Sequence, residues 1–314
     1  MRTIITDDFS KPFCKHSIVT IGNFDGVHKG HQELFRQVNS LARSNNIPSV
    51  VVTFNPHPLR VLQPENRRFC LITTFEQKCE LIAKSKPDLL LVIPFTPDFA
   101  ATGAEEFVKT VLHQFLGVQT LVIGHDYAFG KGREGNEKLL NNLSGKYGFK
   151  LIALDPVTEN GLVFSSSLVR RLVEAGDVAG AVAVLGRYHR VAGQVVPGRK
   201  VGRTLGFPTA NIAVSNELIP ADGVYAVLVE ISGSFYQGAC SVGKNPTFGE
   251  NSRTVEVFVL DFEGDLYNKE LVLHFTERLR APVCFSGVEQ LMAQIQLDVE
   301  RCRQLLDGIT VENG

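Results

Sequence analysis

The sequence predicts an α/β domain built on a doubly wound parallel sheet, followed by an all-β domain, an antiparallel barrel with a closing helix. Up to about residue 185, apolar β-branched runs alternate with amphipathic helical runs. From residue 191 the pattern changes to short strand-like runs separated by turns, and a long helical pattern ends this part of the chain. We therefore expect two domains, residues 1–185 and 186–314.

The first domain is predicted to alternate strands with helices. The expected strands are Ile18–Ile21, Ser49–Phe54, Leu89–Ile93 and Thr120–Ile123, and the expected helices are His31–Ser44, Phe75–Lys84 and Ala104–Leu116. In parallel sheets of this kind, ligands lie beyond the carboxyl ends of the strands. The loops Gly22–His31, Asn55–Pro58 and Gly124–Gly130 each follow a predicted strand. We expect these three loops to meet at one cleft.

The second domain is predicted to begin after one helical segment, Leu168–Leu185, which ends at Gly186. Its strand candidates have the spacing of an antiparallel barrel. They are Val191–Val196, Val224–Ile231, Phe235–Val242, Thr254–Leu260 and Leu271–Phe275. The periodic run Val288–Leu306 then predicts a single closing helix.

Composition narrows the class of protein. The 314 residues are 44% apolar, which is enough for two packed cores, and 32 basic residues against 33 acidic ones give a net charge of −1. This balance gives no reason to expect that the protein binds nucleic acid or an anionic membrane surface through its overall charge. The N-terminal ten residues lack the apolar core of a signal peptide, so we expect a cytoplasmic protein. The six cysteines form no C-x-x-C pair, which argues against a zinc ribbon or a redox site.

The segment after the first strand carries the strongest chemical pattern. Three glycines follow Ile18–Ile21 at four-residue intervals: Gly22, Gly26 and Gly30. Glycines allow close backbone approach, and a helix N-terminus offers free N–H groups, so the arrangement suits a phosphate. His28 and His31, one turn apart, can donate to phosphate oxygens. Neither common phosphate-loop pattern is present. Residue types alone leave three alternatives: a nucleotide site, a metal site of Asp25, His28 and His31, or a capped turn with solvated histidines.

Three other segments of the first domain are candidates for a functional site. In Phe54–Pro58 the two prolines could simply stiffen a strand exit. Gly124–Gly135 is long for a connector, and such loops are often functional. Ser165–Ser167 with Arg170 suits phosphate binding at a helix start, or an ordinary helix cap with a solvated arginine.

The second domain has two candidate segments. Pro208–Asn211 reads P-T-A-N, which in isolation is a turn followed by a strand. The preceding Gly198–Gly206 contains three basic residues between glycines, and we expect a basic flap that closes on phosphates. Glu256 lies in an alternating strand, where an acidic side chain commonly faces solvent.

Longer motifs carry a family resemblance. The run from Gly22 to His31, GNFDGVHKGH, resembles the HxGH signature of nucleotidyltransferases, in the form found in bacterial bifunctional riboflavin kinase/FAD synthetases. Further segments match that family in order and cover nearly the whole chain: Thr53–Pro58, Gly124–Gly135, Ser165–Arg170, Gly206–Ile212 and Val255–Val257.

For the first domain the resemblance implies a nucleotidyltransferase that joins FMN to the AMP part of ATP, giving FAD and pyrophosphate. It implies that His28 and His31 stabilise the transferring phosphorus and the leaving group. The implied nucleotide-binding residues are Gly22, Asn23, Phe24, Asp25 and Gly26, with Ser165, Ser166 and Arg170 on the phosphates. The implied flavin-side residues are Phe54, His57, Asp126 and Tyr127.

For the second domain the resemblance implies a barrel of riboflavin kinase type, which transfers the γ-phosphoryl group of ATP to riboflavin. Thr209 and Asn211 would ligate Mg²⁺, and Glu256 would accept the proton of the ribityl 5′-hydroxyl. The implied nucleotide contacts are Gly202, Arg203 and Gly206, and the implied flavin-side residues are Asn245 and Arg280. The chain departs from the family pattern at Phe258, Asn268 and Ala281–Phe285.

The resemblance implies Mg²⁺ as cofactor and ATP as co-substrate, with riboflavin, FMN and FAD as substrates and products. We expect a monomer or a weak homo-oligomer. Two other hypotheses stay open: an HxGH enzyme acting on a different phosphate ester, such as a pantetheine or nicotinate nucleotide, and a flavin-binding protein without catalytic activity.

Overall fold

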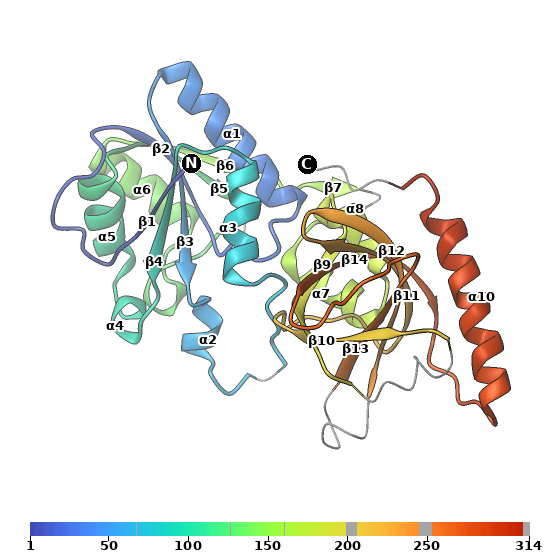
Figure 1. The fold of residues 1–314 in the computed structure, drawn as a ribbon. Coiled ribbons are helices and arrows are strands. Elements are labelled where there is room, and N and C mark those ends of the chain that lie inside the picture. Colours follow the sequence, from blue (N-terminus) through green and yellow to red (C-terminus); the bar gives the residue numbers. More distant parts are fainter. Residues whose placement is uncertain (67, 126, 160, 199–205, 245–252, 310–314) are drawn as a thin grey trace. The chain divides into compact units, whose positions relative to one another are not determined.

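The computed structural model describes residues 1–309 except 67, 126, 160, 199–205 and 245–252, and Figure 1 shows its elements. The chain forms two compact units. The first comprises Met1–Phe69 and Phe75–Ser165, and the second comprises Cys70–Thr74 and everything from Ser166 onward. Helices α7 and α8, which end at Leu185, belong to the second unit. The boundary at residues 185 and 186 stays a prediction about where the functional modules divide.

The first unit contains the predicted parallel sheet, in the strand order β1-β4-β3-β2-β5-β6. Its strands are β1 (Arg2–Ile5), β2 (Ser17–Ile21), β3 (Ser49–Asn55), β4 (Leu89–Pro94), β5 (Val118–Gly124) and β6 (Lys150–Leu154). All neighbouring strands run parallel. The order reverses between β2 and β5, where doubly wound sheets bind their ligands. The sequence predicted the four inner strands, and the structure adds β1 and β6 at the edges.

Both faces of this sheet are covered. Along β3, Val50 and Val52 pack in one apolar cluster and Val51 packs in another, because successive side chains point to opposite faces. The helices of this unit are α1 (Lys29–Asn45), α2 (Pro58–Leu62), α3 (Phe75–Lys84), α4 (Pro97–Ala100), α5 (Ala104–Phe107) and α6 (Glu137–Tyr147). The predicted helix Ala104–Leu116 is α5 continued by a π-helical stretch, Val108–Phe115. A short hairpin, β7 (Thr158–Glu159) with β8 (Leu162–Val163), completes the unit.

The second unit is a closed antiparallel barrel with the order β10-β13-β12-β11-β14-β9, which confirms the predicted barrel. Its strands are β9 (His189–Val196), β10 (Thr209–Val214), β11 (Gly223–Ile231), β12 (Ser234–Lys244), β13 (Arg253–Val259) and β14 (Glu270–Arg280). The closing helix α10 (Val288–Leu306) has the predicted bounds, and Cys302 and Leu306 pack against Leu228 of β11.

One helix expectation was wrong. Leu168–Leu185 is divided into α7 (Ser166–Ala175) and α8 (Val178–Leu185). Gly176 has a φ of 82°, which ends the first helix, and the Asp177 carboxylate accepts a hydrogen bond from the Gly180 N–H at the start of the second.

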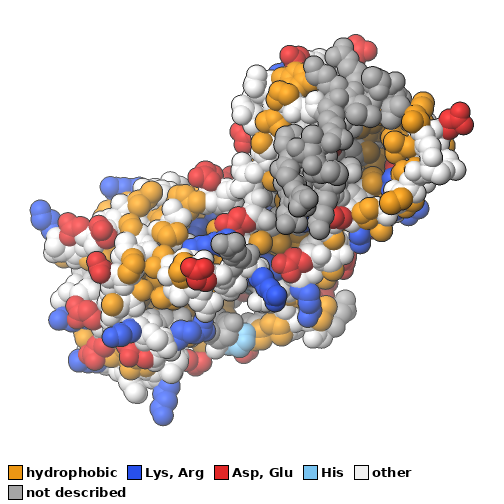
Figure 2. All heavy atoms as spheres, turned by 90° about the horizontal axis from the view of Figure 1, so that it is seen from below, with side chains coloured by type: hydrophobic (Ala, Val, Ile, Leu, Met, Phe, Trp, Pro, Cys, Tyr) orange, Lys and Arg blue, Asp and Glu red, His pale blue; other side chains and the backbone are white. Residues whose placement is uncertain are grey.

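The distribution of charged side chains on the surface agrees with the near-zero net charge. On the face shown in Figure 2, basic and acidic side chains are interspersed with apolar ones. In the portion of the chain that the structure covers, no helix is both long enough and apolar enough to cross a membrane.

Candidate functional site

The loop between β2 and α1 has an unusual backbone. Phe24, Gly26 and Val27 have φ values of 49°, 79° and 40°, in the left-handed region that non-glycine residues seldom adopt. A Cβ atom on Gly22 would lie 2.7 Å from the Phe24 ring, so only glycine fits there. The loop thus turns sharply and places a buried aromatic ring, 1% exposed, below the start of α1.

His28 and His31 lie together at the N-terminus of α1. Their rings stack with centroids 3.6 Å apart, and Phe24 packs edge-on against His31 at 5.1 Å. A Cβ on Gly30 would lie 3.0 Å from the His28 ring, so the third glycine makes room for this imidazole. The structure therefore brings both predicted histidines to the helix end, where N–H groups favour an anion.

The metal alternative for this loop gains no support. Among the residues that the structure describes, no group of three or more His, Cys, Asp or Glu side chains is arranged to hold a metal ion. Asp25 is buried, and its negative charge interacts favourably with the nearby Lys78.

Lys78 is a buried residue of this site that sequence reasoning missed. It lies on α3 and is only 6% exposed. Its Nζ donates to the Phe54 carbonyl at 2.9 Å and lies 3.3 Å from Thr53 Oγ1 and 3.4 Å from the Asn23 carbonyl. Burial lowers the pKa of Lys78, and the Asp25 charge opposes that change. The available signal was a lysine on the apolar face of a helix.

At the exit of β3, the predicted residues have structural partners. Nδ1 of His57 accepts a hydrogen bond from the Leu59 N–H and caps α2, and its ring lies 4.9 Å from that of Phe69. The Phe54 ring packs against Phe95 and Phe99 in the core. Their predicted contact with the flavin stays a prediction.

The glycine-rich loop after β5 is ordered around aromatic rings. Tyr127 and Phe129 stack 5.4 Å apart, and the backbones of Phe129 and Gly135 exchange two hydrogen bonds. A Cβ on Gly135 would lie 2.5 Å from the Phe129 ring, so this position needs glycine.

A shallow cavity of about 670 Å³, wide open to solvent, lies beside this loop and is lined by His125, Tyr127, Ala128, Asn136 and Lys138 among others. The Tyr127 hydroxyl is buried and has no hydrogen-bond partner among the residues described, and burial raises its pKa. The predicted flavin residue Asp126 lies outside the described residues.

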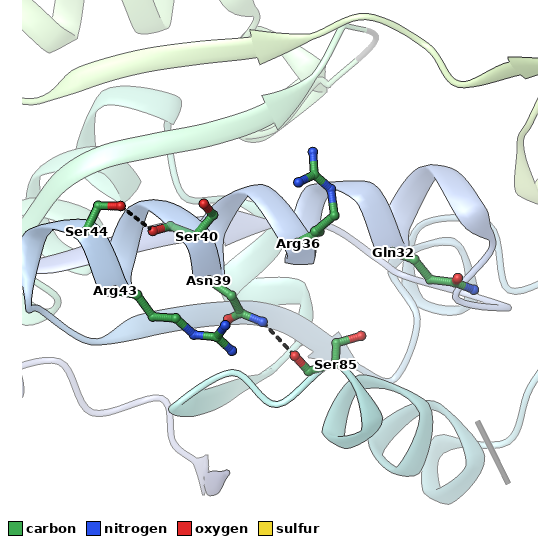
Figure 3. A pocket seen from close by; sticks show the side chains of 7 residues that line it. All are labelled: Gln32, Arg36, Asn39, Ser40, Arg43, Ser44 and Ser85. Carbon is green, nitrogen blue, oxygen red and sulfur yellow. Dashed lines mark hydrogen bonds between the residues drawn. The ribbon is translucent and has the colours of Figure 1, made fainter.

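A second cavity, of about 540 Å³, lies along the outer face of α1 beside Ser85 (Figure 3). Asn39 donates to the Ser85 carbonyl at 2.6 Å across it. Arg36, at its edge, forms an ion pair with Glu33. None of the sequence-predicted site residues lines this cavity.

The serine segment spans the end of the first unit and the start of the second. Ser165 closes the first unit, and Ser166 and Arg170 lie on α7. Arg170 Nε donates to the Cys70 carbonyl at 2.7 Å. The predicted contacts of these residues with phosphates stay a prediction.

In the barrel, strand pairing brings the predicted kinase residues together. Asn211 on β10 is directly opposite Glu256 on β13, and Thr209 is opposite Phe258. All four lie on the face turned away from the core, because they alternate with buried Ala210, Ile212, Val255 and Val257. Directly opposite residues in such a pair have Cβ atoms about 5 Å apart, so the amide and the carboxylate share one patch.

The start of the basic segment contacts this patch. A Cβ on Gly198 would lie 2.0 Å from the Asn211 amide nitrogen, so the Gly198 backbone packs directly on that side chain. The Thr209 hydroxyl and the Asn211 amide oxygen, on one face of β10, are hard oxygen ligands of the kind that Mg²⁺ accepts, which fits the predicted metal site. Gly206 is described, with a φ of 84°, whereas Gly202, Arg203 and Asn245 lie outside the described residues.

Arg280 has a partner that the sequence did not predict. Its Nε lies 3.0 Å from both carboxylate oxygens of Asp298 on α10, and its Nη2 lies 2.8 Å from one of them. This ion pair joins the end of β14 to the closing helix. The predicted flavin contact of Arg280 stays a prediction. At the departure Phe258, the ring packs edge-on against Phe207.

Comparison with known proteins identifies a family for each part of the chain. A family model described as FAD synthetase matches residues 10–168, and one described as riboflavin kinase matches residues 185–306. Among curated proteins, the bifunctional riboflavin kinase/FMN adenylyltransferase of Pseudomonas fluorescens is 36% identical over 296 residues, 94% of each chain. That of Escherichia coli strain K12 is 33% identical over 294 residues, 93% of each chain.

A solved structure described as a macrolide-efflux protein from Streptococcus pneumoniae has a TM-score of 0.88 and 34% identity, covering 96% of this chain and 98% of its own. The two family models follow the order of the two units, and the curated relatives span both. The chain belongs to the bifunctional riboflavin kinase/FMN adenylyltransferase family, with its FAD synthetase domain N-terminal and its riboflavin kinase domain C-terminal.

Proposed function

We propose that the barrel phosphorylates riboflavin through Glu256, Asn211 and Thr209. Glu256 accepts the proton of the ribityl 5′-hydroxyl, whose oxygen attacks the γ-phosphorus of ATP and displaces ADP. Thr209 and Asn211 would hold Mg²⁺, which would neutralise phosphate charge. The direct pairing of Asn211 with Glu256 on the outward face carries this proposal. Gly202, Arg203 and Gly206 would contact the nucleotide, and Asn245 and Arg280 the flavin.

For the first unit, we propose adenylyl transfer to FMN at the start of α1. A phosphate oxygen of FMN attacks the α-phosphorus of ATP, and pyrophosphate leaves. The FMN phosphate is already a competent nucleophile, so positioning and charge stabilisation suffice without a protein base. The stacked pair His28 and His31 carries the proposal, since it presents two imidazoles at an anion-favouring helix end.

The remaining roles in this reaction concern binding. The loop Gly22–Gly26 contacts the nucleotide, and Ser165, Ser166 and Arg170 hold its phosphates. Phe54, His57, Asp126 and Tyr127 lie on the flavin side. Tyr127 also lines the open cavity beside the glycine-rich loop, which supports this part of the proposal. We further propose functional modules of residues 1–185 and 186–314, a cytoplasmic location and a monomer or weak homo-oligomer.

Two crossed variants test the assignment in the full chain. His28→Ala should abolish FAD formation from FMN and leave FMN formation nearly intact. Glu256→Gln should stop FMN formation, while added FMN is still converted to FAD. His16→Ala and Glu270→Gln are matched controls at exposed positions and should alter neither rate.

Loss of both activities in either variant would contradict the separation into two sites. Persistent kinase activity in Glu256→Gln would remove this residue from the role of base. If the unmodified protein adenylates another phosphate ester but not FMN, the first unit serves a different substrate.

A further inference from the structure

We propose that Lys78 is a positioning residue for adenylyl transfer. It fixes the segment that follows β2 against the end of β3. The inference rests on the proposed function of the first unit. Lys78 does not line either cavity described above and is not among the residues that the sequence motifs indicated.

The contacts of Lys78 use its full donor capacity. An ammonium group has three N–H donors, and three oxygens lie within 3.4 Å of Nζ: those of Phe54, Thr53 Oγ1 and Asn23. A buried cation is costly unless it is paired, and an apolar residue would fill the same helix face beside Leu81 and Ile82 more cheaply. We therefore attribute the presence of a lysine here to the segments that its hydrogen bonds hold in place.

Those contacts join two neighbouring strand exits. Asn23 lies two residues beyond the end of β2, in the loop that leads to His28. Phe54 lies at the end of β3, just before the turn that carries His57. The two strands pair in parallel through Ile21 and Val52, so both exits lie at the carboxyl edge of the sheet. Lys78 fastens the two exits at that edge.

The loop that Lys78 holds needs such support. Phe24 and Val27 adopt left-handed backbone conformations, which are unfavourable for residues with a side chain. The Asn23 carbonyl, adjacent to this stretch, accepts from Lys78. The ammonium also places a positive charge near the buried Asp25 carboxylate. Removal of Lys78 should let the loop relax and displace His28 from the position that adenylyl transfer needs.

The test replaces Lys78 in the full chain and measures kcat and KM for FMN adenylylation, together with riboflavin kinase activity. Lys78→Met keeps the length of the side chain but removes its charge and donors, and Lys78→Gln keeps two donors. Lys84→Met is the matched control, because Lys84 lies on the same helix with an exposed side chain near Glu80.

We expect kcat for FAD formation to fall at least about 10-fold in Lys78→Met and less in Lys78→Gln, with KM for ATP and FMN changed less than about threefold. Kinase activity and the Lys84→Met control should match the unmodified protein. The folded fraction of each variant is measured by circular dichroism and used to correct kcat.

Two results would overturn the inference while the proposed function stands: a corrected kcat of Lys78→Met within twofold of the unmodified protein, or a loss fully accounted for by the unfolded fraction. If the unmodified protein forms no FAD from FMN and ATP, the proposed function itself fails and the inference fails with it.

Discussion

The ion pair between Arg280 and Asp298 predicts a large stability change for one isosteric substitution, Asp298→Asn. The Arg280 guanidinium makes three contacts of 2.8 to 3.0 Å with the carboxylate, and Gln294 donates to the same group at 2.9 Å. The side chains of Arg280 and Asp298 are 19% and 8% exposed. The pair is therefore mostly removed from water.

Its magnitude follows from this burial. Breaking a buried ion pair by removing one partner costs about 3–5 kcal/mol, because the remaining charge is left uncompensated. Water reaches part of Arg280, so we expect about 2–4 kcal/mol for Asp298→Asn. Asparagine has nearly the same volume, so no cavity contributes to the loss. Because α10 contacts β11, β12 and β14, we expect this change to lower the free energy of unfolding of the second unit.

Calorimetric unfolding of the full chain, with riboflavin binding measured in parallel, tests this expectation. The control is Asp261→Asn, which removes the partner of Arg303, a residue of α10, in an exposed pair. That change should leave stability nearly unaltered. An Asp298→Asn protein as stable as the control, with riboflavin affinity unchanged or raised, would refute the structural role of the pair and favour direct flavin binding by Arg280.

Three further predictions follow from single contacts. Burial lowers the pKa of His189 from 6.5 to about 4, so its neutral form stabilises the second unit above pH 6.5 and this stability is lost as pH falls toward 4. The free energy of unfolding should fall by about 3 kcal/mol over this pH range. Unfolding of His189→Gln, measured over the same range, should not show this fall. Gly198→Ala should displace the Asn211 amide and lower kinase kcat at least about 10-fold. It should also raise the Mg²⁺ concentration needed for half-maximal rate, and an unchanged Mg²⁺ titration would contradict this. Gly30→Ala should slow FAD formation about 10-fold by pushing the His28 ring, while thermal unfolding shows equal or higher stability because alanine favours the helix.

Much of the fold was predictable because it depends on local sequence patterns. The β-branched runs before Gly22 and Asn55 are buried central strands, and the glycine spacing marked the sharp turn and the helix start. The edge strand β1 was missed because Arg2–Ile5 has only a short apolar pattern. Its partner β4 lies far away in the sequence, so local patterns do not indicate the pairing. The break at Gly176 was missed because a glycine inside a helical pattern is compatible with a continuous helix.

The candidate site was predictable only where side chains carry the chemistry. The pairing of Asn211 with Glu256 depends on the register of β10 and β13, which no local pattern specifies. Lys78 was missed because two of its three acceptors are backbone carbonyls, whose positions depend on the folded sheet. Asp298 was missed for a similar reason, since its partner lies on another element, 18 residues away in sequence.

The most direct test of the account is a chromatographic time course of the purified protein with riboflavin, ATP and Mg²⁺, resolving riboflavin, FMN and FAD. We predict that FMN rises first and is then converted to FAD, with both steps carried out by one chain. FAD formed only from added FMN would contradict the kinase assignment to Thr209, Asn211 and Glu256. No product from either flavin would contradict the account as a whole.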